Sequence, residues 1–156
     1  MTVHDPTLCR MFVTRAKAIL AKHPQIRHEW SIDADEDHCI LVIPKAEPDG
    51  FDITVEVDPE EIIIFGQGFH LHFDEGGIDA KVESSLGLIR DLLGPGMRIM
   101  ECLIGGTPYR WDAQSFQNGQ WITENTSGRF FRKYFGERTY KIYQNKVLEA
   151  RRQRDV

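Results

Sequence analysis

The sequence lacks any apolar run long enough to cross a membrane. The longest runs, Ile40–Ile43 and Ile62–Phe65, contain four residues each, whereas a membrane-spanning helix needs about 20. The first residues, Met1–Pro6, also lack the basic stretch followed by an apolar one that marks a signal peptide. We therefore expect a cytoplasmic protein without a membrane segment.

Cysteine is scarce, and low-complexity segments and internal repeats are missing. The three cysteines, Cys9, Cys39 and Cys102, are odd in number and widely spaced, a pattern typical of reduced thiols and not of a disulfide framework. The chain has 156 residues, of which 41% are hydrophobic and 28% charged. This length and composition predict a single globular domain over residues 1–156, with a basic C-terminal tail from about residue 145.

Sequence signatures of catalysis are missing as well. The chain contains no Gly-x-Ser-x-Gly motif, and Cys102 lies in an apolar run, where a thiol is unreactive. The glycines of Gly66-Gln67-Gly68 and of Gly105-Gly106 lack the spacing of a phosphate-binding loop, and we interpret both segments as hairpin turns or bulges. Enzymatic activity stays open, but the sequence favours a protein without it.

Two apolar stripes at helical spacing predict two main helices. The first runs from Leu8 to Leu20, after Asp5-Pro6 and before His23-Pro24, which predicts a helix over about residues 6–22 with Asp5 as its N-cap. The second runs from Ile78 to Leu93 and ends at Gly94-Pro95-Gly96.

Between the helices the pattern favours strands. Cys39–Ile43 is apolar without alternation and predicts a strand covered on both faces, whereas Phe51–Val57 alternates and predicts one buried face. Strands are also expected at residues 28–32, 62–65 and 69–73.

The last third predicts further antiparallel strands. Asn118-Gly119 is the strongest hairpin signal, between strands at 107–116 and 120–124. Residues 125–128 read as a turn, and Gly136-Glu137 as a hairpin joining 129–135 to 138–143. With Met97–Ile104 the order becomes α-βββββ-α-βββββ. We therefore predict an α+β fold with a mostly antiparallel sheet of about ten strands, two main helices and a short C-terminal helix or tail.

Charge is distributed unevenly along the chain. Residues 129–156 hold nine basic and three acidic residues, a net charge of +6, although the whole chain has a net charge of −5. The basic residues are interleaved with aromatic ones, a combination that suits an acidic protein surface. The overall negative charge disfavours nucleic acid as a partner. The candidate binding residues are Arg129, Arg132, Lys133, Tyr134, Arg138, Tyr140, Trp111 and Trp121. The alternatives are that these rings pack in the core, or that an aromatic sheet face binds a small molecule.

A second candidate site is a divalent transition-metal site. His70, His72 and Asp74 share one face of a predicted strand, and two imidazoles with a carboxylate are suitable ligands for zinc, iron or manganese. His28 or His38 on a neighbouring strand is a candidate third ligand. The alternative is a solvated strand face. Asp33–Asp37 has the opening spacing of a calcium loop, but His38 and Pro44 occupy the positions of its required glycine and glutamate, so we expect a polar turn there.

The leading interpretation is a non-enzymatic, cytoplasmic protein-binding module, with a homodimer as one form of that binding. The small size, the acidity and the α–β–α order are similar to those of bacterial secretion chaperones and toxin-immunity proteins. That similarity involves no motif and assigns no residue, and the chain is assigned to no family on the sequence alone.

Overall fold

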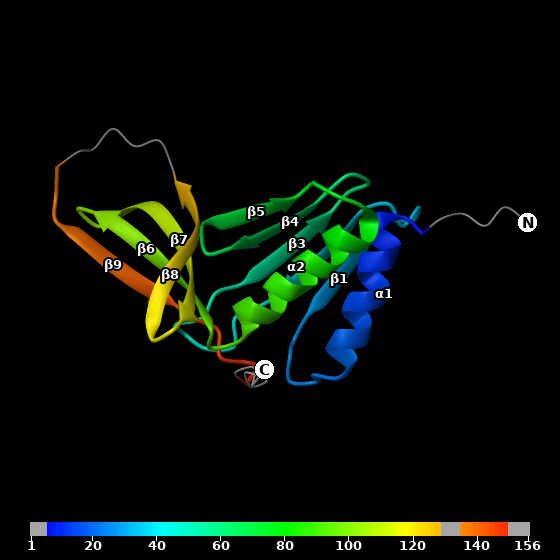
Figure 1. Ribbon diagram of the computed structural model, residues 1–156, viewed down its shortest axis with the longest axis horizontal. Coiled ribbons are helices and arrows are strands. Elements are labelled where there is room, and N and C mark those ends of the chain that lie inside the picture. Colours follow the sequence, from blue (N-terminus) through cyan, green and yellow to red (C-terminus); the bar gives the residue numbers. More distant parts are fainter. Residues whose placement is uncertain (1–5, 129–134, 150–156) are drawn as a thin grey trace, which may run out of the picture. The chain divides into compact units, whose positions relative to one another are not determined.

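A computed structural model describes residues 6–128 and 135–149 and shows an α+β fold with two antiparallel sheets (Figure 1). In chain order the elements are α1 (Leu8–Ala21), β1 (Glu29–Ile32), β2 (Cys39–Ile43), β3 (Ile53–Val57), β4 (Ile62–Gly66), β5 (Phe69–Phe73), α2 (Ile78–Leu93), β6 (Met97–Ile104), β7 (Thr107–Gln117), β8 (Gln120–Gly128) and β9 (Arg138–Tyr143). The predicted fold class is confirmed, with nine strands in the described residues in place of about ten.

The chain divides into two compact units. The first contains residues 1–44, 52–66 and 70–89, and the second contains residues 45–51, 67–69 and 90–156. The first unit thus holds α1, β1–β4 and most of β5 and α2, and the second holds β6–β9. That residues 1–156 form a single domain stays a prediction. None of the described helices is long and apolar enough to cross a membrane.

Helix α1 begins at Leu8, two residues later than expected. Its N-cap is Thr7, whose Oγ1 accepts a hydrogen bond from the Arg10 backbone N–H at 3.2 Å. The prediction of Asp5 as N-cap is wrong, because the hydroxyl of Thr7 supplies the acceptor that the first turn needs. The expected apolar stripe is confirmed, since Leu8, Phe12, Ala16 and Leu20 are all buried.

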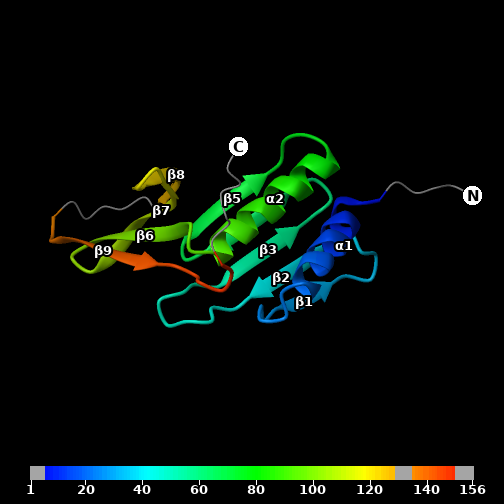
Figure 2. The same ribbon diagram turned by 60° about the horizontal axis from the view of Figure 1, so that its bottom comes forward.

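The sheet of the first unit is a simple meander in the order β1-β2-β3-β4-β5. Cys39 lies opposite Val57, and Val57 opposite Ile62, so alternate residues of these strands share one buried face. Figure 2 shows α1 and α2 over one face of this sheet. The expectation that Cys39–Ile43 is covered on both faces is wrong: Ile40 points to the other face and is 39% exposed.

The sheet of the second unit has the order β8-β7-β6-β9. The hairpin at Asn118-Gly119 is confirmed, and both residues have the positive φ, 50° and 77°, that such a two-residue turn requires. Strand β8 continues to Gly128, so the turn predicted at 125–128 is wrong. A bulge between Ala113 and Gln114 leaves Glu124 of β8 without an opposite residue, and pairing resumes with Ala113 opposite Asn125.

Strand β9 confirms the strand predicted at 138–143, and its partner is β6, with Ile99 opposite Tyr143. The strand predicted at 129–135 falls mostly on residues 129–134, which lie outside the described residues, and Phe135 is not in a strand. Residues 144–149 follow β9 without forming a helix, and the rest of the predicted tail lies outside the described residues.

Candidate functional site

The two faces of the four-stranded sheet carry different chemistry. The pairing places Glu101 opposite Trp111 on one face, and Cys102 opposite Tyr140 on the other, because side chains alternate along a strand. Phe116 pairs with Trp121 across the Asn118-Gly119 turn. Trp111 and Trp121, predicted to act together, therefore lie on opposite faces.

Trp111 belongs to the interior. It is 6% exposed, and its indole N–H donates to Oε2 of Glu101 at 2.7 Å. Glu101 is also buried and accepts from the Gln67 amide and the Tyr143 hydroxyl, each at 3.4 Å. Burial, with Glu101 nearby, raises the pKa of Tyr143. These neutral donors stabilise a buried carboxylate, and we assign the cluster a structural role.

The opposite face is rich in exposed apolar side chains. Phe116 is 52% exposed, Tyr140 59% and Ile142 42%. Basic side chains lie on the same face of β6, β7 and β9. We call this surface the arginine–aromatic face and define it by Arg98, Arg110, Phe116, Trp121, Arg138, Tyr140 and Ile142.

Arg98 is held in place on this face by two contacts. Its Nε donates to Oε1 of Gln114 at 2.8 Å, and its guanidinium carbon lies 4.2 Å from the centre of the Trp121 ring. Gln114 is itself fixed, because its amide nitrogen donates to Oγ1 of Thr123 at 3.3 Å. Partial burial lowers the pKa of Arg98, but a guanidinium remains protonated at neutral pH. The side chain is therefore an oriented positive charge on an aromatic platform.

The face carries more positive than negative charge. Its acidic residue, Asp112, is buried, lies 3.4 Å from Nε of Arg110 and accepts a hydrogen bond from the Thr126 hydroxyl at 2.8 Å. Glu124 of β8 accepts a hydrogen bond from Ser115 and so belongs to the opposite face. Among the residues that the structure describes, no carboxylate on this face is paired with Arg98 or Arg138.

The sequence identified part of this surface. Trp121, Arg138 and Tyr140 lie on it, whereas Trp111 does not. Four predicted members lie outside the described residues, namely Arg129, Arg132, Lys133 and Tyr134.

Two important members of the face were missed. Phe116 could have been predicted from the sequence, because a two-residue turn at Asn118-Gly119 places it opposite Trp121. Arg98 was not, since its stacking on Trp121 requires the pairing of three strands.

The histidines of β5 lie on the exposed face of the first sheet. The rings of His70 and His72 are 5.3 Å apart, and His70 stacks on Phe65 at 6.1 Å. Nδ1 of His72 lies 2.9 Å from the carboxylate of Glu61. Asp74 follows the strand and is exposed. The structure thus places the carboxylate of Glu61 beside His72.

The candidate third ligands lie elsewhere. His28 precedes β1 and His38 precedes β2, whereas β5 is at the far edge of the sheet, beyond β3 and β4. Neither is on a strand next to β5. Within residues 6–128 and 135–149, no group of three or more histidine, cysteine, aspartate or glutamate side chains is placed to hold a metal ion. Metal binding at His70, His72 and Asp74 stays a prediction.

The three cysteines are buried and unbridged. Cys9 of α1 and Cys39 of β2 contact each other, and burial raises the pKa of both thiols. Protonated, buried thiols are poor nucleophiles.

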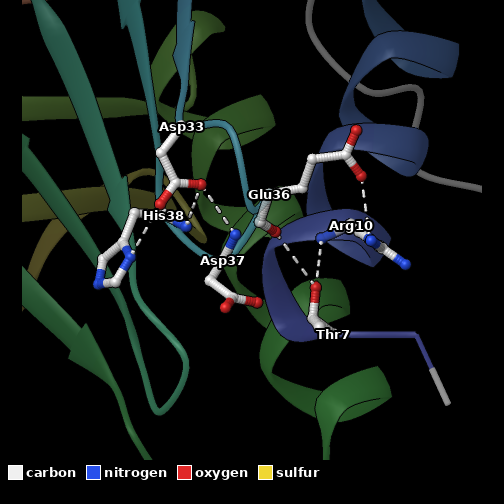
Figure 3. Close-up of polar contacts among 6 residues, drawn as sticks. All are labelled: Thr7, Arg10, Asp33, Glu36, Asp37 and His38. Atoms are coloured by element: carbon white, nitrogen blue, oxygen red, sulfur yellow. Dashed lines mark hydrogen bonds and ion pairs between the residues drawn. The ribbon is translucent and has the colours of Figure 1, made fainter. Parts of the chain in front are cut away.

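The segment with calcium-loop spacing is a polar turn (Figure 3). Oδ1 of Asp33 accepts from the backbone N–H groups of Asp37 and His38 at 2.9 and 3.2 Å. Glu36 has a positive φ of 57° and pairs with Arg10 at 2.9 Å. The carboxylates thus close the turn and join it to α1.

The hydrogen bonds of Asp33 predict a pH-dependent contribution to stability. The backbone N–H of His38 above all, with that of Asp37, lowers the pKa of Asp33 below its ordinary value. A lowered pKa in the folded state stabilises the protein above the unfolded pKa, about 4, and this contribution is lost as the pH falls through the folded value. We expect Asp33→Ala to lower the urea midpoint near neutral pH, with a difference that shrinks towards about pH 3. Asp35→Ala, in the same turn, is the control. A difference that does not change with pH would contradict this account.

Comparison with protein-family models, with curated proteins and with solved structures finds no match for this chain. The geometry of the faces described above is therefore the basis for a functional proposal.

Proposed function

We propose that this chain is a non-enzymatic protein-binding module and that the arginine–aromatic face is its binding surface. The observation that carries the proposal is the group of three large exposed side chains, Phe116, Tyr140 and Ile142, beside an arginine that is already held in place. Aromatic residues and arginine are the types enriched in protein interfaces and in their energetic centres. Burying these side chains against a partner would also remove apolar surface from water.

A selection of peptides from a random displayed library tests the proposal. We expect the wild-type chain to enrich peptides whose affinity falls at least tenfold in the double variant Phe116→Ser/Tyr140→Ser, because a central interface side chain contributes about 2 kcal/mol or more. The matched control is Ile40→Ser/Phe65→Ser, which removes two exposed apolar side chains from the other sheet. Thermal unfolding of each variant shows that it is folded.

Two results would overturn the proposal. One is that the library yields no binder of the wild-type chain. The other is that the peptides bind the Phe116→Ser/Tyr140→Ser variant as tightly as the wild type, or lose binding only in the control variant. Loss of binding only in the control variant would assign binding to the exposed face of the five-stranded sheet.

A further inference from the structure

We propose that the partner is an acidic protein segment in extended conformation, which adds as a strand along β8 and places a carboxylate on Arg98. This inference rests on the proposed function and names the class of partner that the arginine–aromatic face binds.

The first step is the character of β8. This strand of nine residues is at one edge of its sheet and pairs only with β7 among the described strands (Figure 1, yellow). Natural edge strands are usually protected by lysine, arginine or proline, or by being very short. β8 contains none of these residues, whereas β9 at the opposite edge carries Arg138 and Lys141. The one charged residue of β8, Glu124, accepts a hydrogen bond from Ser115 and so lies on the face opposite Arg98. A long edge without lysine, arginine or proline is suited to pairing with an extended segment.

The second step is the reach of Arg98. Its backbone is in β6, but its guanidinium lies on Trp121 of β8 and so crosses the width of β7. A strand added to β8 would lie about 4.8 Å beyond it. A side chain of the added strand on the same face is therefore within reach of the Arg98 guanidinium. The ring centres of Phe116 and Trp121 are 5.1 Å apart, so the side chain two residues further along the added strand is placed to contact Phe116.

The third step is the hydrogen-bonding capacity that Arg98 retains. Its Nε bonds Gln114, and the two Nη groups carry the other four N–H donors. Neither Nη group bonds a residue that the structure describes. Two parallel N–H groups of a fixed guanidinium match a carboxylate, and such paired bonds are stronger than neutral ones. Because stacking and the Gln114 bond already restrict the side chain, little entropy is lost on binding.

Charge favours the acidic partner. Within residues 6–128 and 135–149, Arg98, Arg110 and Arg138 share the face with one carboxylate, Asp112, which Arg110 and Thr126 already satisfy. Complementary charge determines which partners such a surface accepts. The net charge of −5 for the whole chain opposes a long polyanion such as a nucleic acid, and an extended peptide also supplies the backbone groups that β8 can pair with.

The peptides enriched in the library selection test this partner class directly. We expect them to be rich in aspartate and glutamate at alternate positions. Arg98→Lys should weaken their binding at least tenfold, because lysine keeps the charge but loses the planar, paired donors. Arg90→Lys, at an exposed arginine of α2, should have no effect. Replacing the peptide carboxylates by amides should cause a similar loss, and binding should slow amide hydrogen exchange in Gln120–Glu124.

The outcomes separate this inference from the proposed function. If peptides bind through Phe116 and Tyr140 but are not acidic, or bind Arg98→Lys unchanged, the module remains and the acidic partner is wrong. If β8 amides gain no protection, strand addition is wrong. If no peptide binds, both proposals fail. If the chain binds a short oligothymidylate as tightly as the acidic peptides, the partner is nucleic acid and not an acidic segment. If it forms a concentration-dependent dimer that Arg98→Lys abolishes, the partner is a second copy of this chain.

Discussion

Replacing Gly68 by alanine is expected to destabilise the second unit by about 3 kcal/mol or more. Gly68 has a φ of +75°, and a Cβ added there would lie 2.2 Å from Cε2 of Trp111. The indole cannot move aside easily, because it is buried and its N–H bonds Glu101 at 2.7 Å. Gly68→Ala therefore adds a clash with a fixed ring to the cost of a left-handed alanine.

Gly106→Ala separates these two costs. Gly106 has nearly the same conformation, with a φ of +81°, but an added Cβ there meets no atom within 4 Å. We expect that variant to lose only about 1 kcal/mol, the backbone cost alone. Urea unfolding followed by tryptophan fluorescence and circular dichroism measures both. Similar losses in the two variants would mean that Trp111 does not restrict the turn after β4.

The contrast between these glycines shows what a sequence can and cannot supply. Both turns were predicted, because a glycine pair or a Gly-x-Gly between apolar runs is a local signal. The ring against Gly68 is not a local signal, since Trp111 is in β7 and the turn follows β4. Periodicity likewise predicted nearly every element, but not that the strands form two sheets or that β9 pairs with β6.

In the candidate site too, local sequence features were predicted and contacts that depend on strand pairing were not. Charge and aromatic content identified Arg138, Tyr140 and Trp121, because composition can be read without pairing. The pattern could not assign each ring to a face of the sheet. Trp111 was therefore grouped with Trp121, although the two side chains lie on different faces. The same limit affected Cys39–Ile43, where an unbroken apolar run hid the exposed position of Ile40. Residues of this kind are assigned only when strand partners are known.

The second large effect is expected at Asn145, which joins the end of the described chain to the segment before β3. Asn145 is 3% exposed, and its side chain bonds the backbone of Phe51 twice. Oδ1 accepts from the Phe51 N–H at 3.0 Å, and Nδ2 donates to the Phe51 carbonyl at 3.1 Å. Asn145→Ala leaves both backbone groups buried without these partners, at a cost of about 1–3 kcal/mol each. We therefore expect a loss of about 2–4 kcal/mol.

Two further variants make the Asn145 prediction specific. Gln144→Ala removes a neighbouring amide that donates one hydrogen bond, to the Pro95 carbonyl at 2.6 Å, and should cost about 1 kcal/mol.

Asn145→Asp keeps the size of the side chain and the acceptor for the Phe51 N–H, but at neutral pH it places a carboxylate oxygen against the Phe51 carbonyl. A buried charge without a donor is costly, so this variant should be less stable than wild type at neutral pH and should recover partly in acid, where a protonated carboxyl can donate again. Equal stability of Asn145→Ala and Gln144→Ala in urea would show that the paired bonds to Phe51 contribute little. If the loss of stability in Asn145→Asp does not shrink in acid, the hydrogen bond that Asn145 donates to the Phe51 carbonyl does not account for that loss.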